Sequence, residues 1–239
     1  MNYLKFGESK KFIVFLHGWG ADLNSFLFAK DYFQDYSKVF VDFAGFGKTP
    51  EPTKPYFVSN YVEELEKLLI NFDIEELVLV GHSFGGRVAV KFACLNQFNY
   101  KIFKLCLVDA AGIRPKLSWM KKWKIFKFKQ LKKRADKNDK IKRKLSNFGS
   151  NDYKKLTDVM KKTFVNIVNE DLSIFAEKIV CHTAIIWGDK DKETPFKMAK
   201  KLHKLICCSK IFVINGAGHF SFLDDMQEFL IILDTFIKN

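Results

Sequence analysis

Six short apolar runs recur along the chain, and each one ends at a turn that contains glycine, aspartate or asparagine. The runs are residues 12–16, 39–41, 77–80, 105–108, 184–187 and 211–214. Short continuous apolar runs are typical of strands that are buried on both faces of a sheet. Segments with helical spacing of apolar residues lie between most of the runs or after the last one, at residues 59–72, 84–95, 195–205 and 222–237. This alternation predicts an α/β fold, with a mainly parallel sheet and helices on both faces.

The first of these runs is preceded by another extended segment. Residues 2–6 are separated from residues 11–16 by four residues, among them Gly7. Strands this close in sequence can pair antiparallel through a short turn. We expect such a hairpin at one edge of the sheet.

Length and composition suit one α/β domain. The chain has 239 residues, 48% of them hydrophobic, so it can bury a sizeable core, which excludes an intrinsically disordered protein. No run of 18 or more apolar residues occurs, which excludes a membrane-spanning helix. The first residues lack the apolar segment of a secretory signal, and the five cysteines have no metal-ligand spacing. We therefore expect a cytoplasmic protein with reduced thiols.

The strongest motif surrounds Ser83. The sequence Gly81-His82-Ser83-Phe84-Gly85-Gly86 follows an apolar run and precedes a helical segment. A serine on a sharp strand-to-helix turn has a strained backbone, and side chains at positions 81 and 85 would collide with the neighbouring chain. The strain exposes the hydroxyl, and the start of the helix supplies positive potential where an oxyanion forms. This context favours a nucleophilic Ser83 over a structural turn.

A second motif, His17-Gly18-Trp19-Gly20, directly follows the run at residues 12–16. Its small residues let the backbone come close to Ser83. We therefore predict that the backbone N–H groups of Trp19 and Phe84 form an oxyanion hole. The side chain of His17 is interpreted as structural, with hydrogen bonds inside its own loop.

Two further polar turns follow apolar runs nearer to the C-terminus. The first contains Asp189 and Asp191, and either carboxylate could orient a histidine. The second contains His219 among small residues. Serine, aspartate and histidine thus follow one another at the carboxyl ends of predicted strands, where open α/β sheets place their sites. We expect Ser83, one of the two aspartates and His219 to meet there.

With these four motifs in this order, the sequence resembles the α/β-hydrolase superfamily of the serine-nucleophile type with a helical cap. The resemblance covers the chain apart from an insert after residue 113, and it implies the α/β-hydrolase fold. It implies Ser83 as the nucleophile and His219 as the general base. It also implies Asp191 as the acid that orients His219, because the family pattern W-G-x-x-D-x-x-x-P falls on Asp191. Asp189 is then a turn residue.

Residues 41–49 resemble the family's D-x-x-G-x-G-x-S loop, with Thr49 in the serine position. The loop also contains Gly47-Lys48-Thr49, the end of a nucleotide-binding P-loop, but the first glycine of that motif would fall at Asp42. We therefore expect no nucleotide. No His, Asp or Cys spacing indicates a metal, so no cofactor is predicted. Three other histidines are interpreted as turn, strand-edge and helix-surface residues, namely His82, His182 and His203.

The insert, residues 114–176, interrupts the alternation with helical patterns and no buried strand run. In hydrolases that this chain resembles, an insert at this point is the cap that shapes the substrate pocket. We therefore predict a basic helical cap on a core made of residues 1–113 and 177–239. Three aromatic residues at helical spacing are expected to line the pocket, namely Trp119, Trp123 and Phe126.

The insert also carries the excess positive charge of the chain. Residues 114–170 hold 19 lysine and arginine residues against 5 aspartate and glutamate residues, within a formal net charge of +13. The alternative to a cap with solvated lysines is an interfacial helix that makes weak contact with an anionic membrane surface. Nucleic acid is not expected as a partner, because the aromatic residues at helical spacing in the insert are typical of a buried helix face and the sequence contains no nucleic-acid recognition motif.

The predicted reaction is acyl transfer to water. Relatives that open epoxides or remove halide have an aspartate at the position of Ser83. The serine therefore predicts a carboxylesterase-like hydrolase that forms an acyl-enzyme from a small carboxylic ester or related acyl substrate. A thioesterase and a hydrolase of C–C bonds in vinylogous diketones remain open, as does a catalytically silent fold that acts as a binding or signalling module. The complete serine, aspartate and histidine set favours an enzyme.

Overall fold

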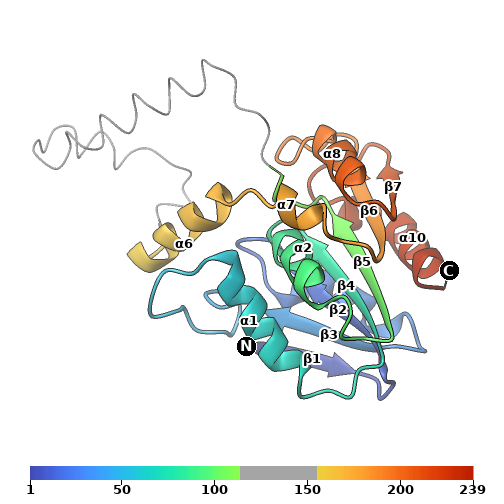
Figure 1. The fold of residues 1–239 in the computed structure, drawn as a ribbon, viewed down its shortest axis with the longest axis horizontal. Helices are drawn as coiled ribbons and strands as arrows, with labels where there is room; N and C mark the ends of the chain where they lie inside the picture. Colours follow the sequence, from blue (N-terminus) through green and yellow to red (C-terminus); the bar gives the residue numbers. More distant parts are fainter. Residues whose placement is uncertain (114–154, 239) are drawn as a thin grey trace, which may run out of the picture.

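The computed structural model describes residues 1–113 and 155–238, and these residues include a seven-stranded sheet (Figure 1). The order of the strands is β1-β3-β2-β4-β5-β6-β7. The strands are β1 (Asn2–Phe6), β2 (Lys11–Leu16), β3 (Ser37–Asp42), β4 (Glu76–His82), β5 (Ile102–Val108), β6 (His182–Gly188) and β7 (Ser209–Ile214). From β3 to β7 all neighbouring strands are parallel, so the predicted α/β fold with a mainly parallel sheet is confirmed.

The predicted hairpin between β1 and β2 is wrong. β1 does lie antiparallel at the edge of the sheet, but its partner is β3, with Asn2 opposite Asp42 and Phe6 opposite Lys38. β2 has parallel neighbours on both sides, β3 and β4, which places its apolar residues in the middle of the sheet. β3 therefore lies between β1 and β2 in the sheet. At the start of β3, the Ser37 hydroxyl donates a hydrogen bond to the carbonyl of Ser9, in the loop that connects β1 to β2 (2.7 Å).

Each face of the sheet has its own apolar core. On one face lie α1 (Val58–Leu69), α2 (Phe84–Asn96) and α8 (Lys197–Leu205), and on the other lie the 3-10 helix η1 (Leu23–Asp31), α9 (Ser221–Asp224) and α10 (Met226–Lys238). Alternate residues of one strand point to opposite faces, so in β2 Val14 joins the first core and Phe15 the second. No helix in the described part of the chain is both long enough and apolar enough to cross a membrane.

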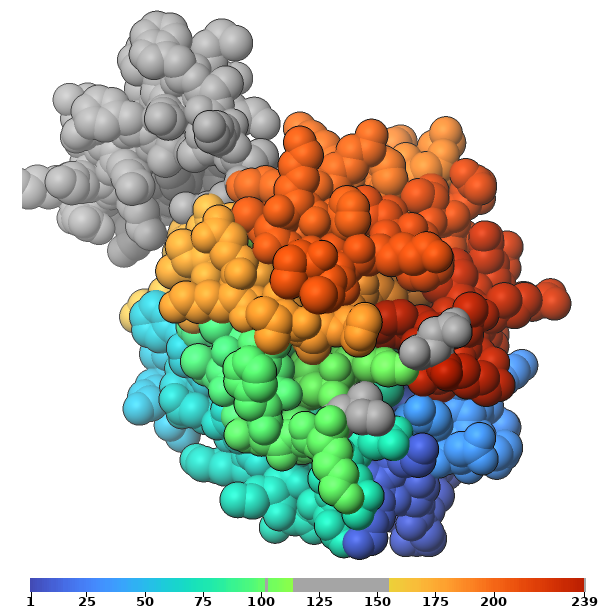
Figure 2. All heavy atoms as spheres, turned by 45° about the vertical axis from the view of Figure 1, so that its right-hand side comes forward, coloured from blue at the N-terminus to red at the C-terminus, as the bar shows by residue number. Residues whose placement is uncertain are grey.

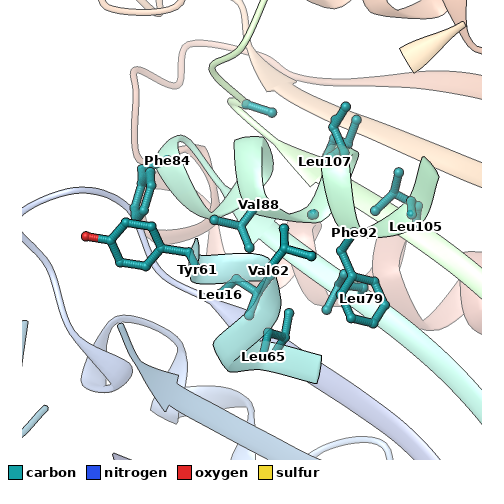
Figure 3. Packing of buried hydrophobic residues seen from close by; sticks show 14 of the residues in the cluster. Leu16, Tyr61, Val62, Leu65, Leu79, Phe84, Val88, Phe92, Leu105 and Leu107 are labelled. Carbon is teal, nitrogen blue, oxygen red and sulfur yellow. The ribbon is translucent and has the colours of Figure 1, made fainter. Parts of the chain in front are cut away.

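The first core packs α1 and α2 onto the central strands (Figure 3). Tyr61 and Leu65 of α1 and Val88 of α2 are fully buried there, beside Leu16 of β2 and Leu79 of β4. This packing fixes the start of α2 against the carboxyl ends of β2 and β4, where the predicted site residues gather.

Two helices of the predicted insert are described, α6 (Asp158–Asn169) and α7 (Ser173–Ala176). α7 packs against α2 and α8, and this segment lies directly on the atoms of α2 in the space-filling view (Figure 2). α6 is attached to the loop before α1, where the Tyr56 amide donates to the Thr163 hydroxyl (3.0 Å). The predicted pocket residues Trp119, Trp123 and Phe126 lie outside the described residues, and the division into core and cap stays a prediction.

Truncation of one residue in the first core tests the importance of this packing. We expect Leu79→Ala to lower the free energy of unfolding by about 2–5 kcal/mol, because the buried leucine leaves a cavity between β4 and the helices. Ile70→Ala is the control, since Ile70 is 85% exposed, and it should change that free energy by less than about 0.5 kcal/mol. Urea unfolding followed by circular dichroism measures both values, and equal effects would contradict the assignment of the core.

Candidate active site

Ser83 occupies a sharp turn between β4 and α2. Its backbone has φ 48° and ψ −106°, a conformation that residues with side chains seldom adopt. The Ser83 amide donates to the carbonyl of Val108 at the end of β5 (3.0 Å), and the Ser83 carbonyl accepts from the Ala111 amide (3.0 Å). The Ser83 side chain makes no capping hydrogen bond to α2. The turn therefore holds the hydroxyl away from its own helix and available to other groups.

Glycine is needed at positions 81 and 85, as predicted, because backbone atoms leave no room for a side chain there. A Cβ atom on Gly81 would lie 2.6 Å from the carbonyl oxygen of Gly85. A Cβ atom on Gly85 would overlap the carbonyl group of Leu16, at the end of β2. Side chains at either position would push α2 away from the sheet, because the obstructing atoms are backbone.

His219 connects Ser83 with Asp191. It lies between β7 and α9, with Nε2 3.0 Å from the Ser83 Oγ and Nδ1 2.9 Å from the Asp191 Oδ2. A carboxylate can only accept, so Nδ1 of the neutral imidazole carries the proton and donates it to Asp191. Nε2 then has a free lone pair that accepts the hydrogen bond from the Ser83 hydroxyl. The structure thus brings together the three residues that the sequence predicted to meet.

The carboxylate of Asp191 is buried and fully engaged. Its Oδ1 accepts from the amides of Glu193 (2.8 Å) and Thr194 (2.9 Å), and its Oδ2 accepts from the Thr194 hydroxyl as well as from His219. Burial acts to raise the pKa of Asp191, but these hydrogen bonds outweigh it and hold the pKa below its ordinary value. Asp191 therefore stays a carboxylate beside His219.

Asp189 has a different set of contacts. Its Oδ1 accepts from the Gly216 amide (2.6 Å), and its Oδ2 lies 3.1 Å from the Lys190 ammonium. The contact with Gly216 joins the turn after β6 to the turn after β7, whereas the contact with Lys190 lies within the turn after β6. Of the two candidate aspartates, Asp191 is thus the one that bonds to His219.

The pKa of His219 reflects opposing influences. Burial lowers the pKa, but the hydrogen bond to Asp191 and the negative charges of Asp191, Glu193 and Asp109 raise it by more. The net result is a pKa above the ordinary value of a histidine. The site therefore favours protonation of His219, which is the state that it must reach when it takes a proton from Ser83.

His82 has a role that its interpretation as a turn residue missed. It is the last residue of β4, it is buried, and its Nε2 lies 2.7 Å from the carbonyl oxygen of His219. Burial and the nearby His219 lower the pKa of His82 to about 3, so the ring stays neutral and donates its Nε2–H to that carbonyl. This bond fixes the backbone of His219 from the side of β4.

Asp109 was also missed by the sequence analysis. It follows β5 with φ 43°, it is fully buried, and burial raises its pKa to about 7. Its Oδ1 accepts from the Gly188 amide (2.9 Å), and its Oδ2 accepts from the amide (3.1 Å) and the hydroxyl (2.6 Å) of Ser221. Asp109 therefore ties the loop that carries Asp191 to the loop that carries His219. A carboxylate directly after a buried strand was the signal for it in the sequence.

A cavity of about 250 Å³ opens onto Ser83 and His219. Trp19 and Phe84, the two residues predicted to form an oxyanion hole, both line it. Phe84 is the first residue of α2, so its backbone N–H has no acceptor within the helix. The ring of Trp19 packs edge-on against the rings of Phe84 and Phe164, at 5.5 and 5.2 Å between centroids.

The insert contributes a wall of this cavity through α6. Phe164, Ile167 and Val168 line the cavity, and their spacing of three and four residues places them on one face of the helix. None of them was singled out from the sequence, although this spacing was the available signal. Predicted cap residues elsewhere in the insert lie outside the described residues.

Two basic residues one turn apart on α2 hold the end of α6 in place. The Arg87 guanidinium donates to the carbonyls of Ile167 (2.8 Å) and Glu170 (3.0 Å), and the Lys91 ammonium lies 2.5 Å from the Glu170 carboxylate. Both basic side chains are nearly buried. Cations at the C-terminal end of a helix are favourable because they meet its free carbonyl groups. These contacts fix the wall that α6 forms over Ser83.

Polar groups elsewhere hold the surrounding loops. The ring of His17 bonds to the Gly18 carbonyl (2.7 Å) and accepts from the Phe43 amide (3.1 Å), which agrees with its structural interpretation. Within the described ranges, no group of three or more His, Cys, Asp or Glu residues is arranged to hold a metal ion.

Comparison with known proteins identifies the family of the chain. The sequence model of the alpha/beta hydrolase family matches residues 13–230, and the chain therefore belongs to this family. A relative along most of the length is the AB hydrolase superfamily protein YisY of Bacillus subtilis, which is 25% identical over 90% of this chain and 87% of that protein. A shorter match, 37% identical over 105 residues, is to 2-succinyl-6-hydroxy-2,4-cyclohexadiene-1-carboxylate synthase of Escherichia coli, with 44% of this chain and 39% of that enzyme covered.

Solved structures share the fold. An esterase from Exiguobacterium antarcticum matches with a TM-score of 0.77 and 23% identity, over 99% of this chain and 95% of that one. A serine hydrolase involved in carbazole degradation matches with a TM-score of 0.74 and 19% identity, over 99% of this chain and 93% of that one. At these identities the likeness is one of architecture, and it confirms the α/β-hydrolase fold that the sequence resemblance implied.

The protonation states of two histidines give a direct test of this geometry. We expect His219 to titrate with a pKa above about 6.5, and Asp191→Asn to lower that pKa because a negative charge and its hydrogen bond are lost. His82 should stay neutral down to about pH 4. Ring ¹H–¹⁵N correlation spectra recorded against pH measure both, with His219→Gln to assign the signal. A pKa of His219 below the ordinary value would contradict the described contacts.

Proposed function

We propose that the chain is a serine hydrolase that cleaves a small carboxylic ester or related acyl compound. Ser83 is the nucleophile, His219 is the general base and Asp191 orients His219. The observation that carries this proposal is the continuous hydrogen-bonded chain from the Ser83 Oγ through both nitrogens of His219 to the Asp191 Oδ2, at 3.0 and 2.9 Å. Nucleophile, base and orienting group within hydrogen-bond distance of one another are what nucleophilic catalysis by serine requires.

The first half of the reaction forms the acyl-enzyme. As the Ser83 Oγ attacks the substrate carbonyl, its proton passes to the Nε2 of His219, and the resulting imidazolium is stabilised by the carboxylate of Asp191. The proton then moves from Nε2 to the leaving oxygen, and the C–O bond breaks. The raised pKa of His219 assists the first transfer, and the fixed position of Asp191 keeps the proton of Nδ1 in place.

The charge that develops on the carbonyl oxygen needs donors. The backbone N–H groups of Phe84 and Trp19 are proposed to supply them, since both residues line the cavity beside Ser83 and the first N–H of α2 has no acceptor in its helix. Water then enters, loses a proton to Nε2 and attacks the acyl-enzyme, which releases the acid and restores Ser83.

The substrates tested should include compounds in which a bond other than a carboxylic ester is cleaved. Because the same set of Ser83, His219 and Asp191 could attack other acyl bonds, a vinylogous diketone and a thioester belong beside the carboxylic esters, and solved proteins of this fold include an esterase and a serine hydrolase involved in carbazole degradation. A silent fold that serves as a binding or signalling module would hydrolyse none of them. The fully hydrogen-bonded set of Ser83, His219 and Asp191 favours an enzyme, because binding alone does not require it.

Loss of the nucleophile tests the proposal. Ser83→Ala should abolish labelling by a fluorophosphonate probe and lower kcat by about 10⁴-fold or more on the best ester of a p-nitrophenyl series, because no covalent intermediate can form. Thermal unfolding of the variant, followed by circular dichroism, controls for loss of the fold. Turnover at the wild-type level would show that Ser83 is not the nucleophile.

The two aspartates provide a matched pair. Asp191→Asn should lower kcat on the order of 10⁴-fold, because an amide beside Nδ1 favours the wrong tautomer of His219. Asp189→Asn removes the same charge two residues away and should cost far less, since Asp189 bonds to Gly216. A larger loss with Asp189→Asn would reverse the assignment.

The pH dependence of the same pair has a defined sign. The base must be neutral, so kcat/KM should rise as His219 loses its proton, along an acid limb above about pH 6.5 because the pKa of His219 is raised. In Asp191→Asn the limb should move to lower pH, whereas in Asp189→Asn it should stay.

A further inference from the structure

The charged groups in the cavity are unevenly placed around His219. Among the described residues that line the cavity, the acidic and basic side chains besides the two histidines, His82 and His219, are Glu193 and Arg87. Arg87 is held against α6 by its bonds to the carbonyls of Ile167 and Glu170. Glu193 instead lies beside the imidazole of His219, with its Oε2 3.4 Å from the Nε2 of His219.

The carboxylate of Glu193 is at the mouth of the cavity and is not part of the hydrogen-bonded set below it. Its side chain is 70% exposed, while that of His219 is 9% exposed. The backbone of Glu193 is fixed, because its amide donates to the Asp191 Oδ1 (2.8 Å). The buried Asp191 carboxylate thus anchors the backbone of Glu193, and the Glu193 carboxylate is exposed to solvent beside the Nε2 of His219.

Nε2 defines which part of a substrate meets this carboxylate. In the proposed reaction Nε2 gives its proton to the oxygen of the leaving alcohol, so that oxygen must come within hydrogen-bond distance of Nε2. The acyl carbon is bonded to Ser83 at this point, on the other side of the breaking C–O bond. Substituents on the alcohol carbon therefore lie nearest to Glu193, and the acyl chain lies farther away.

An aromatic ring also lies beside His219. Phe220 lines the cavity, is 44% exposed, and has its ring centroid 5.5 Å from that of His219. A cation over the face of such a ring, within about 6 Å of its centroid, is attracted to it. A carboxylate and an exposed ring next to the departing alcohol are groups that suit a positively charged leaving group and disfavour a negatively charged one.

We infer that the substrate class of this site is esters whose alcohol part carries a positive charge, with Glu193 and Phe220 as the residues that recognise it. This inference rests on the proposed function, since it uses the direction of proton transfer from His219. The Glu193 carboxylate contacts His219, whereas Lys190 is paired with Asp189 at 3.1 Å and the Arg87 guanidinium, which keeps its positive charge, is held against α6 by carbonyl groups.

Three butyrate esters of similar shape separate charge from size. Butyrylcholine has a cationic alcohol, 3,3-dimethylbutyl butyrate replaces its nitrogen with carbon, and the butyrate ester of 3-hydroxypropanoate is anionic. We expect kcat/KM to fall in this order, with a ratio of cationic to neutral ester of about three to ten, as a partly solvated charge pair at about 5 Å would give.

Two variants and one control locate the effect. In Glu193→Gln the ratio of cationic to neutral ester should fall most of the way to one, because only the ring of Phe220 remains. In Phe220→Leu the ratio should fall by less, because the carboxylate remains and an apolar side chain replaces the ring. Glu8→Gln removes an equal charge in the loop between β1 and β2, where Glu8 is 95% exposed, and should keep the wild-type ratio. The ratio cancels any change in overall activity.

The outcomes distinguish this inference from the proposed function. If no ester is cleaved and no fluorophosphonate labels Ser83, the proposed function fails. If labelling depends on Ser83 but the three esters react equally, or the ratio survives in Glu193→Gln, the inference of a cationic leaving group is overturned while the hydrolase remains. A labelled protein that does not cleave the cationic ester also overturns it.

Discussion

The strained backbone of Ser83 is the constraint on which the site depends. A residue with a side chain at φ 48° costs on the order of 1–3 kcal/mol, and it persists because its surroundings determine it. Bonds from Ser83 to Val108 and Ala111 fix the turn to β5 and the residues after it. Gly85 lets the first turn of α2 touch the end of β2. The strain thus supplies both an exposed hydroxyl and a helix start beside it.

Buried carboxylates then join the remaining loops to that turn. Asp109 bonds to Gly188 and Ser221, and Asp191 bonds to Thr194 and His219, so the loops after β5, β6 and β7 are linked through acceptors that cannot leave without cost. Burying a carboxylate is unfavourable unless donors surround it. Here N–H and O–H groups surround both, and the result is a rigid frame around His219 that does not depend on the mobile ends of long side chains.

How far the sequence could predict this arrangement depends on the range of the interactions. The six apolar runs are strands because burial on both faces is written into each run locally, and Ser83, Asp191 and His219 meet because the carboxyl ends of parallel strands share one edge. The partner of β1 was missed. β2 pairs with β3 and β4, which are distant in sequence, so β1 pairs with β3 and not with the strand that follows it in the chain. The roles of Asp109 and His82 were missed because neither residue belongs to a motif that names its partner, Gly188 for Asp109 and His219 for His82, whereas Ser83, Asp191 and His219 each stand in a motif of their own.

The local charge of the site differs from the charge of the chain. The net charge of +13 comes from residues 114–170, whereas Asp109, Asp191 and Glu193 all raise the pKa of His219. Exposed charges are screened within about 8 Å at physiological ionic strength, so a charge acts most strongly on the groups nearest to it. Groups within hydrogen-bond distance of His219 act on the transition state itself, in a partly dry environment where each charge counts for more. A basic isoelectric point therefore says little about the charge that a substrate should carry at the point of reaction, and the carboxylates around the imidazole say more.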